Sequence, residues 1–467
     1  LIFYRDCNGA DVNAVSEQLK VWNHPTLSSI TVNFVSRQDV SPTCTPVAGS
    51  PGPLLCGTGS NGGNGLGAIE KVLYRSAAVS LSGAPPAEGW IFTYENFSRS
   101  NTVSNLLNPA NYGMTLAAKI YHLDTPDDSP VFNATPHFVS CAGTPFSFNG
   151  NAIDPNLDSL VFSFGVPYYN IQGASYNPPV DPIPVPFEIG FSVTNPTPNQ
   201  SLNPANIPAS LNPVSGELTF TCVNIGNYVV KILVKSFRQG ILISEVEREM
   251  QLMMMPCSGG NNPPVFTAPF PGNSYNLTVN AGDLVSFNLT ATDTDLLQDG
   301  SPQTLTMTGS GPMYGTNFTS GTGCSVAPCA QLNTSLPISG IGSVSTQFNW
   351  QTTCDHISDA QGNAMDQMTY TYVFRVQDDY CQVPQANYAT ITIHVLNTGI
   401  ISAPEINCIQ TANTDDLSIF WNPVNNNNNS FVSYQIYSVQ NGLIGTVTDI
   451  NANSFVVPAI YTHHEFY

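Results

Sequence analysis

The sequence predicts an all-β protein made of tandem β-sandwich modules, and two of its features support that prediction. Apolar or alternating runs bounded by turn residues recur along the whole chain, which is typical of short strands. The 36 glycines and 37 prolines, together with many Ser, Thr and Asn, favour turns over helices. At about 100–200 residues per domain, a chain of 467 residues holds three or four such modules.

The first module is predicted over 1–126. Its expected strands are LIFYRDC (1–7), ITVNFVS (30–36), IEKVLYRSAAVSL (69–81), WIFTYEN (90–96) and MTLAAKIYH (114–122). Only SEQLK (16–20) hints at a short helix, and no other segment has sustained helical periodicity.

Two later segments, 127–257 and 258–398, look like copies of one unit. The matching landmarks are DDSPVF and NNPPVF, CAGTPFSF and NAGDLVSF, ELTFTC and QFNWQTTC, and a closing hairpin at 228–252 and at 370–395. About seven strands per unit, inward–outward alternation and Pro-rich junctions describe a β-sandwich of immunoglobulin or cadherin type. The Pro-containing linkers at Asp127–Pro130 and Gly259–Pro264 are expected to be stiff and to hold the sandwiches end to end.

The last segment, 399–467, shows a third kind of module. A Pro-containing start (SAPEINC), a Trp strand (LSIFWNPV) and a Tyr-x-Ile-Tyr strand (SYQIYSV) follow one another. This order resembles a fibronectin type III module that is incomplete here. The chain begins and stops within apparent strands, so we expect a piece of a longer secreted protein.

Charge excludes two classes of partner. Twelve Lys and Arg stand against 32 Asp and Glu, which gives a net charge of -20. Such a chain lacks the basic face that binds nucleic acid or an anionic membrane surface. No apolar run reaches the roughly 18 residues of a membrane span. A surface polar through amides and hydroxyls fits an extracellular structural or adhesive protein.

The eleven cysteines predict disulfides in an oxidising compartment, because they are scattered through strand-rich segments and none forms a CxxC pair. We expect Cys354 to pair with Cys381 around a strand pair, Cys324 with Cys329 across a tight loop, and Cys44 with Cys56. Of Cys141, Cys222 and Cys257, the pair Cys141–Cys257 is favoured because first and last strands are neighbours in such a sandwich. The odd total leaves one cysteine unpaired or bound outside the chain, and the partners of Cys7, Cys222 and Cys408 stay open.

Acidic turns are the candidate calcium sites. In cadherin-like modules an Asp-x-Asp turn and an Asp after a late strand converge on a calcium ion, which takes six to eight oxygen ligands. The matching residues are Asp293, Asp295 and Asp378 in the second copy. In the first copy Asp154 and Asp158 match the turn, but Ser236 stands at the late position, so a weaker site or none is expected. The alternative is that these Asp side chains only bond their own turns.

Several stretches resemble large secreted surface proteins of the Bacteroidetes, often described as gliding motility-associated. They are LIFYRDCNG (1–9), WIFTYENFSRSNTVSNLLNPANYGMTLAAKI (90–120), FVSCAGTPFSFNGNAIDPNLDSLVFSFG (138–165) and GNYVVKILVKSFRQGILISEVEREMQL (226–252). The family often has a Cys pair where Asn96-Phe97-Ser98 stands here. The resemblance implies a repetitive adhesin or fibre subunit exported by type IX secretion.

We therefore expect a non-enzymatic extracellular or cell-surface protein, attached to the outer membrane or released. The expected partners are other copies of the chain, surface or secretion-system proteins, or glycans; calcium is the one expected cofactor. The sequence contains neither HExxH nor GxSxG. Two alternatives stay open: spacer modules of a secreted enzyme with its catalytic domain elsewhere, and a filament subunit joined by edge-strand exchange.

Overall fold

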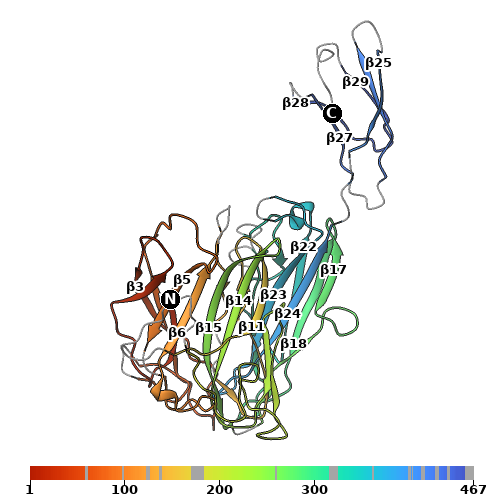
Figure 1. Ribbon diagram of the computed structural model, residues 1–467. Helices are drawn as coiled ribbons and strands as arrows, with labels where there is room; N and C mark the ends of the chain where they lie inside the picture. Colours follow the sequence, from red (N-terminus) through yellow and green to blue (C-terminus); the bar gives the residue numbers. More distant parts are fainter. Residues whose placement is uncertain are drawn as a thin grey trace.

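The computed structural model describes residues 1–57, 62–96, 99–121, 127–135, 139–169, 183–257, 260–314, 324–359, 362–397, 401, 403–411, 416–425, 431–438 and 442–457. Within these ranges the regular structure is β-strand apart from two short 3₁₀ helices, η1 (Pro109–Asn111) and η2 (Cys354–Ile357), which confirms the all-β prediction. Figure 1 shows three modules packed into one body and a fourth beyond it. We call them module one (1–121), repeat one (127–257), repeat two (260–397) and module four (403–457).

Module one is one curved sheet with the strand order β1-β4-β3-β2-β5-β6. Its strands are β1 (Ile2–Asp6), β2 (Ser16–Trp22), β3 (Ser29–Asp39), β4 (Ile69–Arg75), β5 (Trp90–Asn96) and β6 (Met114–Ile120). The helix expected over 16–20 is wrong, because these residues lie in β2 and pair with β3 on one side and β5 on the other. An isolated helix of five residues is unstable in water, so pairing with two strands prevails.

Repeat one and repeat two share most of their strand pairings. The strands of repeat one are β7 (Val131–Phe132), β8 (Val139–Cys141), β9 (Pro145–Asn149), β10 (Ala152–Ile153), β11 (Ser159–Phe164), β12 (Ile207–Leu211), β13 (Glu217–Thr221), β14 (Gly226–Arg238) and β15 (Ile241–Met255). Those of repeat two are β16 (Val265–Thr267), β17 (Asn276–Asn280), β18 (Leu284–Thr292), β19 (Thr304–Ser310), β20 (Gln331–Leu332), β21 (Ile338–Ile341), β22 (Ser343–Gln351), β23 (Gln367–Gln377) and β24 (Ala386–Leu396). In each, an early strand runs parallel to the last strand, β8 beside β15 and β17 beside β24.

The sandwich cores follow from the alternation of the strands. In β22 every second residue is buried, and Phe348 and Trp350 pack against Tyr370 and Tyr372 from the facing sheet. Repeat one is closed in the same way by phenylalanines of β9 and β13 packed on the apolar side of β14. Buried aromatic side chains that meet edge to face add to the area that they remove from water.

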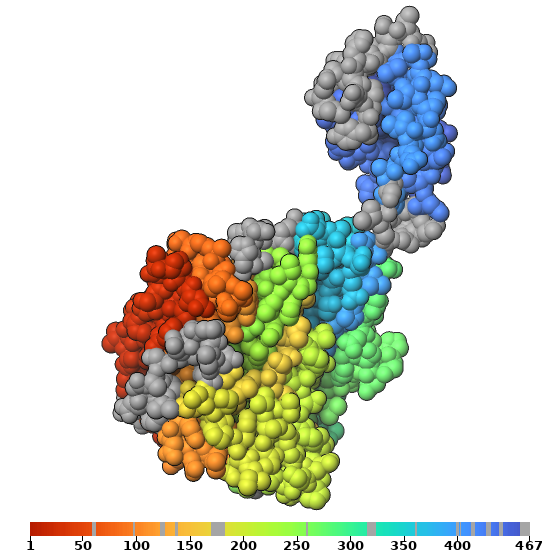
Figure 2. All heavy atoms as spheres, viewed as in Figure 1, coloured from red at the N-terminus to blue at the C-terminus, as the bar shows by residue number. Residues whose placement is uncertain are grey.

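The modules lie side by side, so the expected end-to-end arrangement is wrong. Strand β6 of module one pairs with β15 of repeat one, and the two sheets merge into one of ten strands. The core of repeat one is completed by Val373 and Tyr388 of repeat two. Figure 2 shows the colours of these three modules joined without a break across the body. Backbone pairing and apolar burial across both junctions outweigh the stiffness of the linkers.

Module four is a smaller sandwich of two sheets. Its strands are β25 (Ile406–Thr411), β26 (Leu417–Trp421), β27 (Tyr434–Ser438), β28 (Gly442–Val447) and β29 (Ser454–Val457). The order is β25-β26-β29 in one sheet and β27-β28 in the other. Trp421 of the Trp strand and Tyr434, the first tyrosine of the Tyr-x-Ile-Tyr strand, pack together in its core.

None of the helices in the described part of the chain is long and apolar enough to cross a bilayer.

Candidate functional site

Two of the four predicted disulfides are confirmed. Cys141 pairs with Cys257 at a Cα–Cα distance of 5.4 Å, because β8 lies beside the end of β15. Cys324 pairs with Cys329 across the short loop. Both pairs join segments that are neighbours in sequence or in the predicted sandwich, which is why the sequence could identify them.

The predicted pair Cys354–Cys381 is wrong, because Cys381 bonds Cys44 of module one, 337 residues away. The segment around Cys44 lies along the end of β23: Thr45 N–H donates to Asp379 O at 2.8 Å, and the Gln377 side chain donates to Thr43 O at 3.2 Å. This docking brings the two sulfurs together. Cys354, at the start of η2, is exposed and has no disulfide partner.

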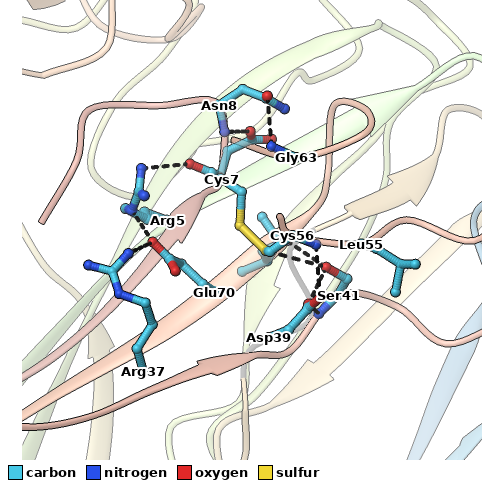
Figure 3. The surroundings of a disulfide bond; sticks show 12 residues. Arg5, Cys7, Asn8, Arg37, Asp39, Ser41, Leu55, Cys56, Gly63 and Glu70 are labelled. Atoms are coloured by element: carbon cyan, nitrogen blue, oxygen red, sulfur yellow. Dashed lines mark hydrogen bonds and ion pairs between the residues drawn. A yellow bond between two sulfur atoms is a disulfide. The ribbon is translucent and has the colours of Figure 1, made fainter. Parts of the chain in front are cut away.

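The predicted pair Cys44–Cys56 is wrong for the same reason, and Cys56 bonds Cys7 instead. Figure 3 shows this bridge joining the end of β1 to the loop that precedes β4, beside the ion pairs of Glu70 with Arg5 and Arg37. The Cys56 N–H donates to Asp39 Oδ2 at 2.8 Å, which fixes the loop. The partner of Cys7, left open by the sequence, is therefore Cys56.

Cys222 is buried and unpaired, and its thiol lies 3.1 Å from Asn224 O. Burial raises the pKa of the thiol, so it stays protonated and unreactive. Cys408, in β25, is partly exposed and has no disulfide partner.

The acidic turn of repeat one gathers Asp154 and Asp158 with a third carboxylate that the sequence did not single out, Asp127. One oxygen from each lies within 4.8 Å of the others, and no other group of three such ligands occurs in the described part of the chain. Arg238 sits among them, with its Nη2 at 2.7 Å from Asp127 and 2.5 Å from Asp158. A fixed guanidinium therefore already balances two of the three carboxylates.

The third carboxylate of this turn is held by hydroxyl and amide donors. Ser236 Oγ donates to Asp154 Oδ2 at 2.8 Å, and the Asn156 N–H donates to Oδ1 at 2.9 Å. Burial raises the pKa of Asp154 to about 6. Burial, followed by the nearby Asp154 charge, raises the pKa of Asp127 to about 7, while Arg238 opposes that rise. Desolvation thus disfavours ionisation of the Asp127 and Asp154 carboxyl groups, and the positive charge of Arg238 opposes that effect at Asp127.

The acidic turn of repeat two is built differently, with donors in place of a cation. The Asp378 carboxylate accepts the Tyr380 and Gln385 N–H groups and the Asn261 side-chain amide at 3.0–3.1 Å. Asp295 accepts the Asn262 N–H at 2.7 Å and so ties the turn to the start of the repeat. Burial raises the pKa of Asp378 to about 8, and the charge of Asp293 adds to the rise.

Two oxygens near this second turn have no hydrogen-bond partner among the described residues, Asp293 Oδ2 and Gln303 Oε1. Gln303 is fully buried and donates through Nε2 to Asn261 Oδ1 at 2.6 Å, which links it to Asp378 through Asn261. The side chain of the adjacent Asp379 binds the backbone of β19 instead, since its Oδ1 accepts the Thr304 N–H. A buried oxygen without a hydrogen-bond partner costs folding free energy. These two oxygens are therefore acceptors that a further ligand of the turn could use.

The sequence missed Arg238 and Asn261 as members of these turns. Arg238 ends β14, next to the turn of the hairpin, and a cation next to a turn does not by itself indicate a site. Asn261 belongs to the NNPP stretch that the repeat comparison used only as a landmark. Arg238 bonds a carboxylate 80 positions away in the chain, and Asn261 one that is 117 positions away.

Comparisons with known proteins define no family. No family model matches the chain, and no curated protein matches it. Among solved structures, three domains of Drosophila N-cadherin (EC1-3) are 12% identical, cover 83% of this chain and 92% of their own, and give a TM-score of 0.18. Chicken CNTN1 FN1-FN3 gives 10% identity, 73% and 90% coverage and a TM-score of 0.14. The surface layer protein SbsC, domains 1-6, is 9% identical, covers 93% of this chain and 54% of its own, and gives a TM-score of 0.15.

Proposed function

We propose that the chain is a non-enzymatic, extracellular structural module that holds a rigid body and a further sandwich at the cell surface. The observation that carries this proposal is the Cys44–Cys381 bridge between module one and repeat two. Disulfides persist in oxidising compartments and are rare in the cytosol, so four of them in one chain favour an extracellular site.

The bridge closes a ring of contacts, and this supports a mechanical role. Module one pairs with repeat one through β6 and β15. Repeat one contacts repeat two through polar side chains, with Ser147 Oγ 2.8 Å from Asn387 Oδ1 and Asn149 Nδ2 3.1 Å from Thr390 Oγ1. The disulfide joins the first member to the third. Three modules in a closed ring of contacts resist bending and shear more than three modules joined only by their linkers.

At a finer level, we place the protein among adhesin-like or fibre-forming surface proteins of the type IX secreted, gliding-associated kind. Its partners would be copies of itself, surface or secretion-system proteins, or glycans. The support is the sequence resemblance together with the rigid body. The test is biotinylation of intact cells of the source organism, followed by thiol alkylation and non-reducing peptide mapping. Surface labelling with an intact Cys44–Cys381 peptide is the expected result; an intracellular protein with free Cys44 would overturn the proposal.

A binding assay separates the possible partners. The purified chain is expected to bind a surface-extracted fraction, a neutral glycan array or itself, without turning over a substrate in the culture supernatant. Light scattering distinguishes self-association from capture by another surface. If activity in the supernatant disappears when a downstream domain is removed, the modules are spacers of a secreted enzyme.

We further propose that repeat two binds one calcium ion and that repeat one does not. The support in repeat two is the pair of partnerless oxygens, Asp293 Oδ2 and Gln303 Oε1, beside Asp378 and Asp295. Carboxylate and amide oxygens are the ligands that calcium prefers. In repeat one, Arg238 takes the place that a cation would need. Calcium is expected to raise the melting temperature of the wild type but not of Asp378→Ala; identical curves with calcium and with chelator would contradict the site.

A further inference from the structure

A buried cluster of charged side chains lies where module one meets repeat one. Lys231 of β14 has no side-chain exposure, and its Nζ lies 2.8 Å from Glu247 Oε2 on β15. The contact does not have hydrogen-bond geometry, and Nζ has no hydrogen-bond partner among the described residues. The ring of Tyr168 covers the nitrogen at 4.5 Å from its centroid. An ammonium group has three N–H donors, and those of Lys231 have no hydrogen-bond acceptor among the described residues.

Among the neighbouring acidic side chains that the structure describes, only Glu247 forms an ion pair with Lys231. Glu249 stands directly opposite Lys231 in the hairpin, but its carboxylate is held by the guanidinium of Arg99. Arg99 in turn donates to Gly113 O and Tyr168 O, and so it is fixed in place. Burial raises the pKa of Glu247, while the Lys231 ammonium opposes that rise. Burial in this site therefore disfavours the charged form of the Glu247 carboxyl.

We infer that Lys231 and Glu247 condense to an intramolecular amide that crosslinks β14 to β15. Because Oε2 is bonded to the carboxyl carbon, the nitrogen lies within about 4 Å of that carbon, close to the separation from which buried groups react. The N–C bond forms and one C–O bond breaks. The two charges cancel, two protons leave the nitrogen, and they depart with the carboxyl oxygen as water. No oxidant or other reactant is consumed.

The surroundings favour the condensation in two ways. The Ala117 N–H, from β6 of module one, donates to Glu247 Oε2 at 2.7 Å and polarises the carboxyl group, as an oxyanion donor does. Two groups held in contact in a water-excluded site also have effective molarities of about 10⁵–10⁸ M, which offsets the excess of water in the surrounding solvent. Docking of module one onto β15 thus completes the site, so the crosslink would form only in the folded chain.

The chain offers a matched control on the same hairpin. Lys235 and Glu245 are cross-strand partners, and Lys235 Nζ lies 3.3 Å from Glu245 Oε1. The Lys235 side chain is 36% exposed, so its ammonium group is in contact with water. In both pairs the amine nitrogen lies within ion-pair distance of a carboxylate oxygen on the other strand of the hairpin, but only Lys231 is shielded from water. Only the buried pair is therefore expected to react.

Mass spectrometry of the full chain, with its disulfides reduced, tests the inference directly. The expected result is a mass below the sequence mass by one water, with a chymotryptic map in which Lys231 and Glu247 occur in one branched peptide. Lys235 and Glu245 should occur in linear peptides. Recovery of Lys231 and Glu247 in separate linear peptides from the folded wild type, meaning an ion pair only, would overturn the inference.

Variants tie the mass change to the two residues. Lys231→Met with Glu247→Met removes both charges while retaining apolar volume, and the loss of water should disappear; Lys235→Met should retain it. A double variant that still lacks one water would also overturn the assignment. Because the wild-type peptide map decides without any variant, the test holds even if a substitution prevents folding.

Discussion

The acidic turns of the two repeats lie at matching places in sandwiches that share most of their strand pairings, yet their charges are balanced by different chemistry. In repeat one, Arg238 supplies a fixed cation to Asp127 and Asp158. In repeat two, Asp378 is surrounded by backbone and amide donors, and two oxygens nearby have no partner among the described residues. The same short Asp pattern thus leads to a permanently closed turn in one copy and to a turn with spare acceptors in the other.

The largest expected effect is the loss of the fixed cation. Arg238→Met leaves the buried Asp127 and Asp158 side chains without their cation, which typically costs about 3–5 kcal/mol of unfolding free energy. Urea denaturation at pH 7 measures it. Adding Asp127→Asn and Asp158→Asn should recover most of the loss, because neutral amides need no cation. If the single variant is as stable as the wild type, Arg238 does not balance this turn.

The second prediction concerns the bridge beside the turn of repeat two. Replacing Cys44 and Cys381 by Ser should lower the unfolding free energy by about 2–4 kcal/mol, since the bridge closes a very long loop of the unfolded chain. The matched control replaces Cys324 and Cys329, which close a loop of only a few residues and should cost less. Equal losses from the two double variants would show that loop closure is not the source of the stabilisation.

The third prediction separates the hydroxyl donor of repeat one from its arginine. Ser236→Ala removes the hydrogen bond to Asp154 Oδ2 and should cost about 1.5–3 kcal/mol, the range for bonds to charged groups. It should also raise the pKa of Asp154 further, because Ser236 lowers it. NMR titration of the Asp154 carboxyl carbon measures the second effect. An unchanged titration would mean that Ser236 does not contribute to the turn.

At low pH, Asp378→Asn is expected to change the free energy of unfolding least of the four sets of substitutions. Its effect on that free energy should also depend most clearly on pH. The pKa of Asp378 is raised by burial to about 8 in the folded chain, above its ordinary value of 3.8. The folded state therefore holds the proton more tightly, and stability falls as pH rises from near 4 through about 8. The variant should match the wild type near pH 4 and exceed it near pH 9. Parallel stability curves across this range would contradict the protonated state.

Some of the molecule follows from short stretches of sequence. Alternation in β22 and in the hairpins β14–β15 and β23–β24 predicts the strands and the repeat, because side chains of a strand point to its two faces in turn. The Cys324–Cys329 pair needs no fold to identify it. The segment 16–20 shows the limit of such patterns: it hints at a helix alone and becomes β2 because strands on both sides pair with it.

The sequence by itself determined the all-β class, the repeated sandwich, the Cys324–Cys329 pair and the positions of the acidic turns, because each depends on residues close in the chain or on a regular period. The Cys141–Cys257 pair, 116 positions apart, followed from the strand order expected for such a sandwich. Only the tertiary structure decided that the modules lie side by side, that Cys44 meets Cys381, and that Arg238 lies among the carboxylates of repeat one. These contacts join segments tens to hundreds of residues apart. They arise from the docking of whole sheets, whose free energy is summed over many side chains and is not written in any one motif.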